Sequence, residues 1–146
     1  MAIEYTLLCD ADCGTTALRA FLTTEIEGDG CCGHTVFCHG MYVTVADGET
    51  PRDTAPFGFE HRATATFHFS DLADDATDER NTACMVRSVL DLVERYACHG
   101  VLLFNGELVI AQWTPAEVVF DRDWELWSTV DAVAGHPMRR LPQPLL

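Results

Sequence analysis

Apolar and polar residues alternate along two segments of the chain, which predicts two strands that each bury one face. In residues 3–9, Ile3, Tyr5, Leu7 and Cys9 alternate with Glu4, Thr6 and Leu8. In residues 61–70, Ala63, Ala65, Phe67 and Phe69 point one way, and polar side chains point the other. Because this second face is polar, we expect an antiparallel strand with one side turned to solvent or to a partner.

After Gly14 the apolar spacing changes to three and four residues, which predicts a short amphipathic helix. Leu18, Phe21 and Leu22 form its apolar face, and Thr15 or Thr16 can cap its start. The glycines that follow this segment end the predicted helix.

A second, longer helix is predicted from residue 78 to about residue 96. Its expected cap is Asp75 or Thr77, and Gly100 is expected to stop it. Its apolar positions recur at helical spacing: Val86, Val89, Leu90, Val93, Tyr96 and Ala97.

Three further β-rich regions complete the predicted sheet. Residues 34–39 and 41–46 are separated only by Gly40, which favours two short strands over a single bulged strand. In residues 101–113, Asn105-Gly106 lies between two apolar runs and is typical of a type I′ turn. Residues 118–120 can add one more strand.

The order of these elements predicts an α+β fold, with two helices packed on one face of a mostly antiparallel sheet. Residues 47–60 are expected to form a loop, and the proline-containing residues 135–146 an irregular C-terminal segment. A chain of 146 residues with 48% hydrophobic content suits a single domain, residues 1–146.

The composition indicates a cytoplasmic protein without a membrane segment. No apolar run approaches the roughly 20 residues needed to cross a bilayer, and no basic segment precedes the first apolar residues. The seven cysteines cannot all pair with one another, which favours free thiols in a reducing compartment.

The formal charge of −14 indicates which class of partner the chain binds. The chain contains no lysine, and a nucleic-acid surface needs a cluster of lysine or arginine side chains. We therefore expect a basic protein as the partner and no nucleic acid.

The stretch GDGCCGHTVFCHG concentrates the soft metal ligands of the chain, which are Cys31, Cys32, His34, Cys38 and His39. Structural zinc sites usually present paired ligands such as CxxC, whereas Cys31 and Cys32 are adjacent. Cys38 and His39 point to opposite faces if they share a strand. We expect no metal and no cofactor here; the alternative is a small enzyme or metal-binding protein that uses residues 31–39.

The sequence shows no motif of a nucleotide-binding loop, a serine hydrolase or a zinc protease, which favours a function without catalysis. Tryptophans beside carboxylates are typical of protein-binding patches, although these aromatics can equally complete the core. The predicted binding residues are the anchors Trp124 and Trp127 and an acidic rim of Asp121, Asp123, Asp74 and Asp75. An exposed edge strand that pairs two copies of the chain is an alternative interface.

The segment MVRSVLDLVERYACHGVLLFNGELVIAQW, residues 85–113, joins an apolar helix to an FNGE hairpin. It resembles the corresponding part of the swarming-inhibition (Sit) type immunity proteins, and the opening MAIEYTL also resembles the start of such chains. The resemblance implies a protein without catalytic activity that binds and neutralises a cognate bacterial toxin. It implies no particular binding residues, and the cysteine-rich middle and the tail from Asp123 onwards differ from that group.

Overall fold

The computed structural model describes residues 3–47, 58–121 and 138–141. These residues form two helices and nine strands. In chain order they are β1 (Ile3–Cys9), α1 (Gly14–Glu25), β2 (Gly30–Cys32), β3 (Thr35–Cys38), β4 (Met41–Asp47), β5 (Ala63–Phe69), α2 (Asp75–Tyr96), β6 (Gly100–Phe104), β7 (Leu108–Thr114), β8 (Glu117–Asp121) and β9 (Met138–Leu141).

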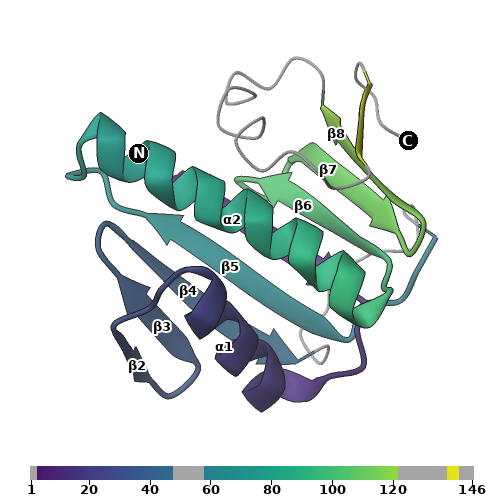
Figure 1. The fold of residues 1–146 in the computed structure, drawn as a ribbon, viewed down its shortest axis with the longest axis horizontal. Helices are drawn as coiled ribbons and strands as arrows, with labels where there is room; N and C mark the ends of the chain where they lie inside the picture. Colours follow the sequence, from purple (N-terminus) through teal and green to yellow (C-terminus); the bar gives the residue numbers. More distant parts are fainter. Residues whose placement is uncertain (1–2, 48–57, 122–137, 142–146) are drawn as a thin grey trace.

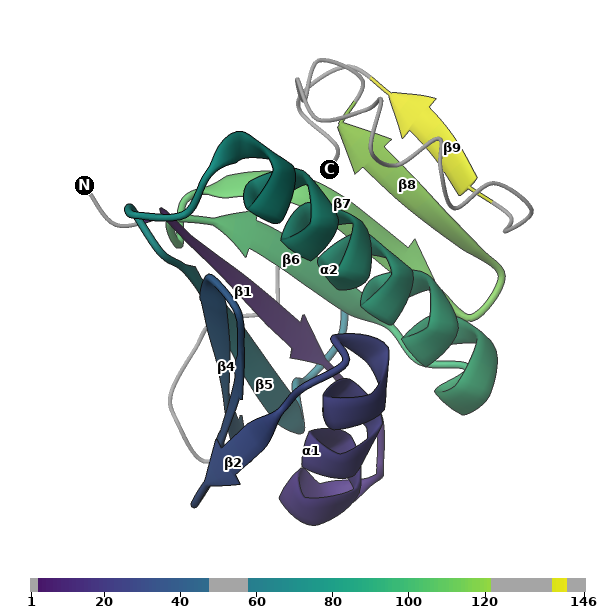
Figure 2. The same ribbon diagram turned by 60° about the vertical axis from the view of Figure 1, so that its left-hand side comes forward.

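All nine strands belong to one sheet with the order β2-β3-β4-β5-β1-β6-β7-β8-β9. The neighbours are antiparallel except for β8 and β9, which run parallel. Both helices lie on the same face of this sheet, α1 over the β4 side and α2 along the middle (Figures 1 and 2). The predicted α+β fold, with two helices on one face of a mostly antiparallel sheet, is confirmed.

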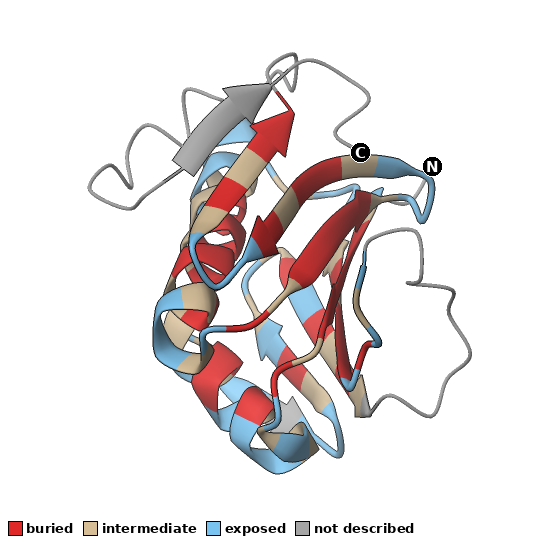
Figure 3. Ribbon diagram, turned by 90° about the vertical axis from the view of Figure 1, so that its right-hand side faces the viewer, coloured by how far each residue is buried: buried red, intermediate tan, exposed pale blue. Residues whose placement is uncertain are grey.

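The main core lies between the helices and the sheet. Alternate residues of β1, namely Tyr5, Leu7 and Cys9, pack there with residues of both helices such as Leu18 and Met85. A smaller apolar cluster lies on the opposite face and consists of Leu8, Val101 and Leu103, with Phe59 and Val109 against it. Figure 3 shows the buried residues concentrated in the central strands and on the inner side of α2.

The second face of β5 is less open than its polar pattern predicts. Thr64 is buried there, and Thr66 and His68 are half-buried. His68 stacks on Tyr42 of β4, with ring centroids 4.3 Å apart, and its Nδ1 lies 3.5 Å from a carboxylate oxygen of Glu4. Side chains of the neighbouring strands β1 and β4 thus cover part of the β5 face that the alternating pattern predicts to be exposed.

The ends of both helices differ from the predictions. Asp74, rather than Asp75 or Thr77, caps α2, because its carboxylate accepts a 2.8 Å hydrogen bond from the Thr77 backbone N–H. No side chain caps α1, which begins at Gly14, so the predicted caps Thr15 and Thr16 are wrong. The second helix ends with Ala97 in a left-handed conformation, before Gly100 is reached.

The predicted type I′ hairpin between β6 and β7 is confirmed. Asn105 and Gly106 have φ angles of 49° and 75°, and the Glu107 N–H donates to the Phe104 carbonyl over 3.1 Å. Two short strands were not predicted from the sequence. These are β2, which pairs with β3, and β9, which occupies part of the segment expected to be irregular. No helix in the described part of the chain is long and apolar enough to span a bilayer.

Candidate partner-binding groove

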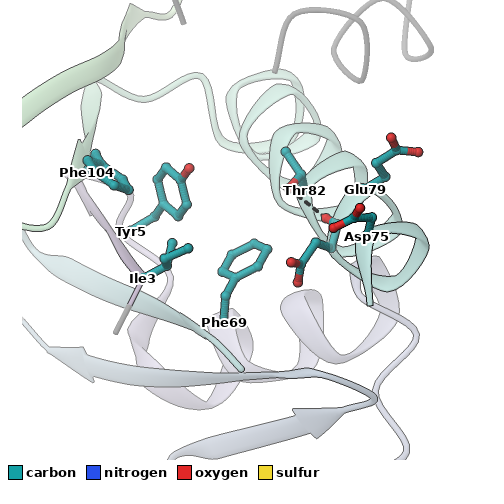
Figure 4. Close-up of a pocket in the computed structure, with 8 residues that line it drawn as sticks. Ile3, Tyr5, Phe69, Asp75, Glu79, Thr82 and Phe104 are labelled. Atoms are coloured by element: carbon teal, nitrogen blue, oxygen red, sulfur yellow. Dashed lines mark hydrogen bonds between the residues drawn. The ribbon is translucent and has the colours of Figure 1, made fainter. Parts of the chain in front are cut away.

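A cavity of about 380 Å³ opens between the N-terminal turns of α2 and the strands beneath them. Its floor is apolar and comes from three adjacent strands. Ile3 and Tyr5 belong to β1, Phe69 to β5 and Phe104 to β6. Figure 4 shows these side chains facing the helix across an open space. We call this cavity the α2 groove.

Strand register brings the three aromatic rings of the floor together. Ile3 pairs with Phe69 across β1 and β5, and Tyr5 pairs with Phe104 across β1 and β6. The Tyr5 ring lies 5.5 Å from Phe69 and 5.2 Å from Phe104, between centroids, with both pairs inclined. Ile3 remains 38% exposed, so the groove keeps an accessible apolar edge.

The opposite wall is acidic and follows from helical spacing. Asp75, Asp78, Glu79 and Thr82 occur three, four and seven positions apart and therefore share one side of α2. The positive end of the helix dipole stabilises carboxylates in this first turn. Among the described residues that line the α2 groove, none is basic.

Asp78 has the most unusual environment in this wall. Its Oδ1 atom is shielded from solvent and has no hydrogen-bond partner in the structure. Desolvation, with smaller contributions from the negative charges of Asp75 and Asp74, raises the pKa of Asp78. At the neighbouring cap, the hydrogen bonds from Thr77 lower the pKa of Asp74.

The groove therefore combines aromatic faces with carboxylates, and both attract cations. Its carboxylates do not converge as metal ligands, because no group of three histidine, cysteine or carboxylate side chains in the described residues can hold an ion. The arrangement suits an organic cation such as a basic side chain of another protein.

Two of the predicted binding residues lie at this groove. Asp75 is part of its wall, and Asp74 caps the same helix beside it. Asp121 lies elsewhere, at the end of β8, and is only 4% exposed. The role of Asp121 in the acidic rim stays a prediction. Trp124, Trp127 and Asp123 lie outside the described residues.

The floor of the groove was not predicted from the sequence. Trp113 and Phe120, which stand near the predicted anchors in sequence, are buried core residues. The spacing of Asp75, Asp78 and Glu79 is a signal that could have placed them on one helical side, but the helix was predicted to begin only at residue 78. The aromatic floor had no such local signal, because its members come from strands far apart in the chain.

The cysteine and histidine cluster lies on the β2–β3 edge of the sheet, and its described side chains form no group of three that could hold a metal ion. Cys31 and Cys32 belong to β2, while Cys38 ends β3. The side chains of Cys32, His34 and His39 are exposed, whereas Cys38 is half-buried and donates its S–H to Asn81 Oδ1 over 3.8 Å. The geometry of these described residues lends no support to the alternative of an enzyme or metal site at residues 31–39.

A second cavity, of about 490 Å³, contains a histidine–carboxylate pair. His99 Nδ1 lies 3.1 Å from Asp10 Oδ2, and the His99 backbone N–H donates to Asp10 Oδ1 over 2.7 Å. Cys98 lines this cavity as well, but its side chain is 3% exposed and hydrogen-bonds the Cys9 thiol. Because the thiol is buried in the core beside another thiol, the pair lacks the accessible nucleophile that Cys–His catalysis requires.

Comparison with known proteins gives one family. A family model described as SitI3-like matches residues 3–131, a range that includes the helix and hairpin of residues 85–113. Neither the curated proteins nor the solved structures give a match.

Proposed function

Because the chain belongs to the SitI3-like family, an immunity-type family whose model covers residues 3–131, we propose that it binds and neutralises a cognate, basic bacterial toxin without catalysis of its own. Family membership is the observation that carries this proposal. The structure adds a groove that suits a cationic group, built from Asp75, Asp78 and Glu79 over an apolar floor.

The charge of the chain supports a basic partner. A formal charge of −14 attracts a basic protein over long distances and raises the rate of productive encounter. The same charge opposes binding to nucleic acid. We place the complex in the cytoplasm because the six cysteines described in the structure are free thiols, which suits a reducing compartment.

A growth assay tests the proposed function. The gene of the cognate toxin is expressed from an inducible promoter in a sensitive host, with and without the chain. We expect the chain to restore growth and to co-purify with the toxin in a stoichiometric complex. An unrelated acidic protein of similar size and charge is the control and should give no protection.

Continued cell death with both proteins present and folded would overturn neutralisation. Protection without a physical complex would instead point to an enzymatic mode of action, and would also contradict the proposal. Isolation of the chain only as a homodimer that excludes the toxin would favour the alternative interface between two copies.

A further inference from the structure

We propose that the α2 groove accepts a single arginine side chain of the toxin, with its guanidinium held between the aromatic floor and the carboxylates of α2. This inference deepens the proposed function and rests on it for the identity of the partner. The groove itself can be tested without the toxin.

The floor of the groove matches the flat, weakly hydrated faces of a guanidinium group. Arginine stacks on aromatic rings more readily than lysine does, and its aliphatic stem packs on apolar surface. Tyr5, Phe69 and Phe104 provide the rings, and Ile3 provides an exposed apolar contact at the entrance. An arginine can therefore pack its stem on Ile3 and bring its head to the groove side of the rings, of which Tyr5 and Phe69 are 4% and 8% exposed.

The wall of the groove supplies hydrogen-bond acceptors for the same group. Asp75 and Glu79 are exposed and lie one helical turn apart, so their carboxylates can accept from different N–H groups of one guanidinium. Asp78 adds a third negative charge to this wall, although its Oδ1 atom is itself shielded from solvent. A bound cation also offsets the negative charge of Asp75, which adds to the larger effect of desolvation in raising the pKa of Asp78.

Other occupants fit the groove less well. An anion would face three carboxylates, and the described side chains do not converge on a metal ion. A purely apolar side chain would leave Asp75 and Glu79 unpaired and partly desolvated, which is unfavourable. Charge complementarity therefore selects a cation, and the rings favour arginine over lysine.

The first experiment titrates the full ¹⁵N-labelled chain with N-acetyl-arginine amide, followed by two-dimensional NMR. We expect saturable shifts, with millimolar affinity, confined to the amides of Ile3–Tyr5 and Asp75–Glu79. N-acetyl-citrulline amide, which has a similar shape without the charge, should produce no such shifts. N-acetyl-lysine amide should bind more weakly than the arginine probe.

Two results of this titration would overturn the inference. One is equal binding of citrulline and arginine amides, which would show that charge does not matter. The other is a pattern of shifts that is absent from the groove or spread over the whole acidic surface, which would show that the groove is not the site.

The second experiment compares two doubly substituted chains of equal net charge. Asp75→Asn/Glu79→Gln neutralises two exposed carboxylates of the groove, and Asp29→Asn/Glu60→Gln neutralises two exposed carboxylates elsewhere. Asp74 is left unchanged because it caps α2. We expect the groove variant to bind the arginine amide and the toxin at least about tenfold more weakly, and the control variant to bind like the wild type.

The outcomes separate the inference from the proposed function. Toxin binding that is equally strong in both variants would overturn the groove as the arginine site and leave toxin binding intact. Failure of the wild-type chain to bind the toxin would overturn the proposed function, while the amide titration would still show whether the groove selects arginine.

Discussion

At the scale of single residues, Gly100 leaves the space that Trp113, a large and fully buried side chain, occupies. Gly100 pairs with Trp113 across β6 and β7, and Trp113 is 2% exposed. A Cβ atom at position 100 would lie 2.6 Å from Trp113 Nε1 and closer still to two ring carbons. Gly100 thus makes room for the indole, whereas its pattern in the sequence indicated only a helix stop.

We expect Gly100→Ala to lower the free energy of unfolding by about 2–3 kcal/mol, because a buried indole has little space to move away. Urea unfolding followed by tryptophan fluorescence measures this loss. Gly30→Ala is the matched control, since a Cβ atom there meets nothing within 4 Å, and it should change stability by less than about 0.5 kcal/mol. Equal effects of the two substitutions would contradict the steric explanation.

At the scale of elements, a cluster of charges joins α1 to α2. Glu25 ends α1, and its Oε2 lies 3.7 Å from Arg87 Nε of α2, while Arg87 also donates from Nη2 to the Glu25 carbonyl over 2.6 Å. Burial, followed by a hydrogen bond and repulsion from Asp91, raises the pKa of Glu25 from 4.5 to about 7, although Arg87 acts in the opposite direction. The helix pair therefore holds a proton that the unfolded chain releases at lower pH.

This shift gives stability a definite dependence on pH. The folded pKa of Glu25 lies above its unfolded value, so its contribution is fully present below about pH 4.5 and is lost as pH rises through about 7. We expect a loss of about 1 kcal/mol, because solvent screens part of the interaction. Glu25→Gln should remove this dependence in urea unfolding measured at several pH values.

Glu27→Gln is the matched control for the helix pair, because Glu27 is exposed and contacts Arg80 on the same helix as Arg87. It should keep the wild-type slope of stability against pH between about 4.5 and 7. A wild-type slope in Glu25→Gln would show that another group holds the proton.

For the whole molecule, charge governs the encounter with the proposed toxin. A chain with a formal charge of −14 should bind a basic partner with an association rate that falls steeply with salt. Between about 50 and about 500 mM NaCl we expect the association rate to drop at least about tenfold, with a smaller change in dissociation. Stopped-flow or surface-based kinetics measure both rates, and a salt-independent association rate would contradict electrostatic steering.

The α+β fold and the immunity-type family were both predictable from the sequence, and both are confirmed. The predictions succeeded where a signal is local, as in the alternation of β1, the apolar spacing of α2 and the Asn105-Gly106 turn. The predictions failed for the shortest strands and for the helix caps. Three residues in β2 and four in β9 are too few for periodicity to identify, and the cap of α2 lies one residue before the expected Asp75.

Only the acidic wall of the candidate site was predictable, because only the wall depends on local spacing in the sequence. Helical spacing alone puts the side chains of Asp75 and Glu79 on one side of α2. The burial of Asp121 and the gathering of Ile3, Phe69 and Phe104 depend on strand pairing between distant segments. The roles of Trp124, Trp127 and Asp123, and the single domain of residues 1–146, stay predictions.

The sequence by itself determined the helices, most strands, the tight hairpin and the acidic character of this protein, because each depends on neighbouring residues or on composition. Only the tertiary structure decided which aromatic side chains meet α2. Register across β5, β1 and β6 is a long-range property, since residue 3 meets residue 69 and residue 5 meets residue 104 only when their strands pair. The groove exists because that register places an apolar floor beneath carboxylates that the helix had already aligned.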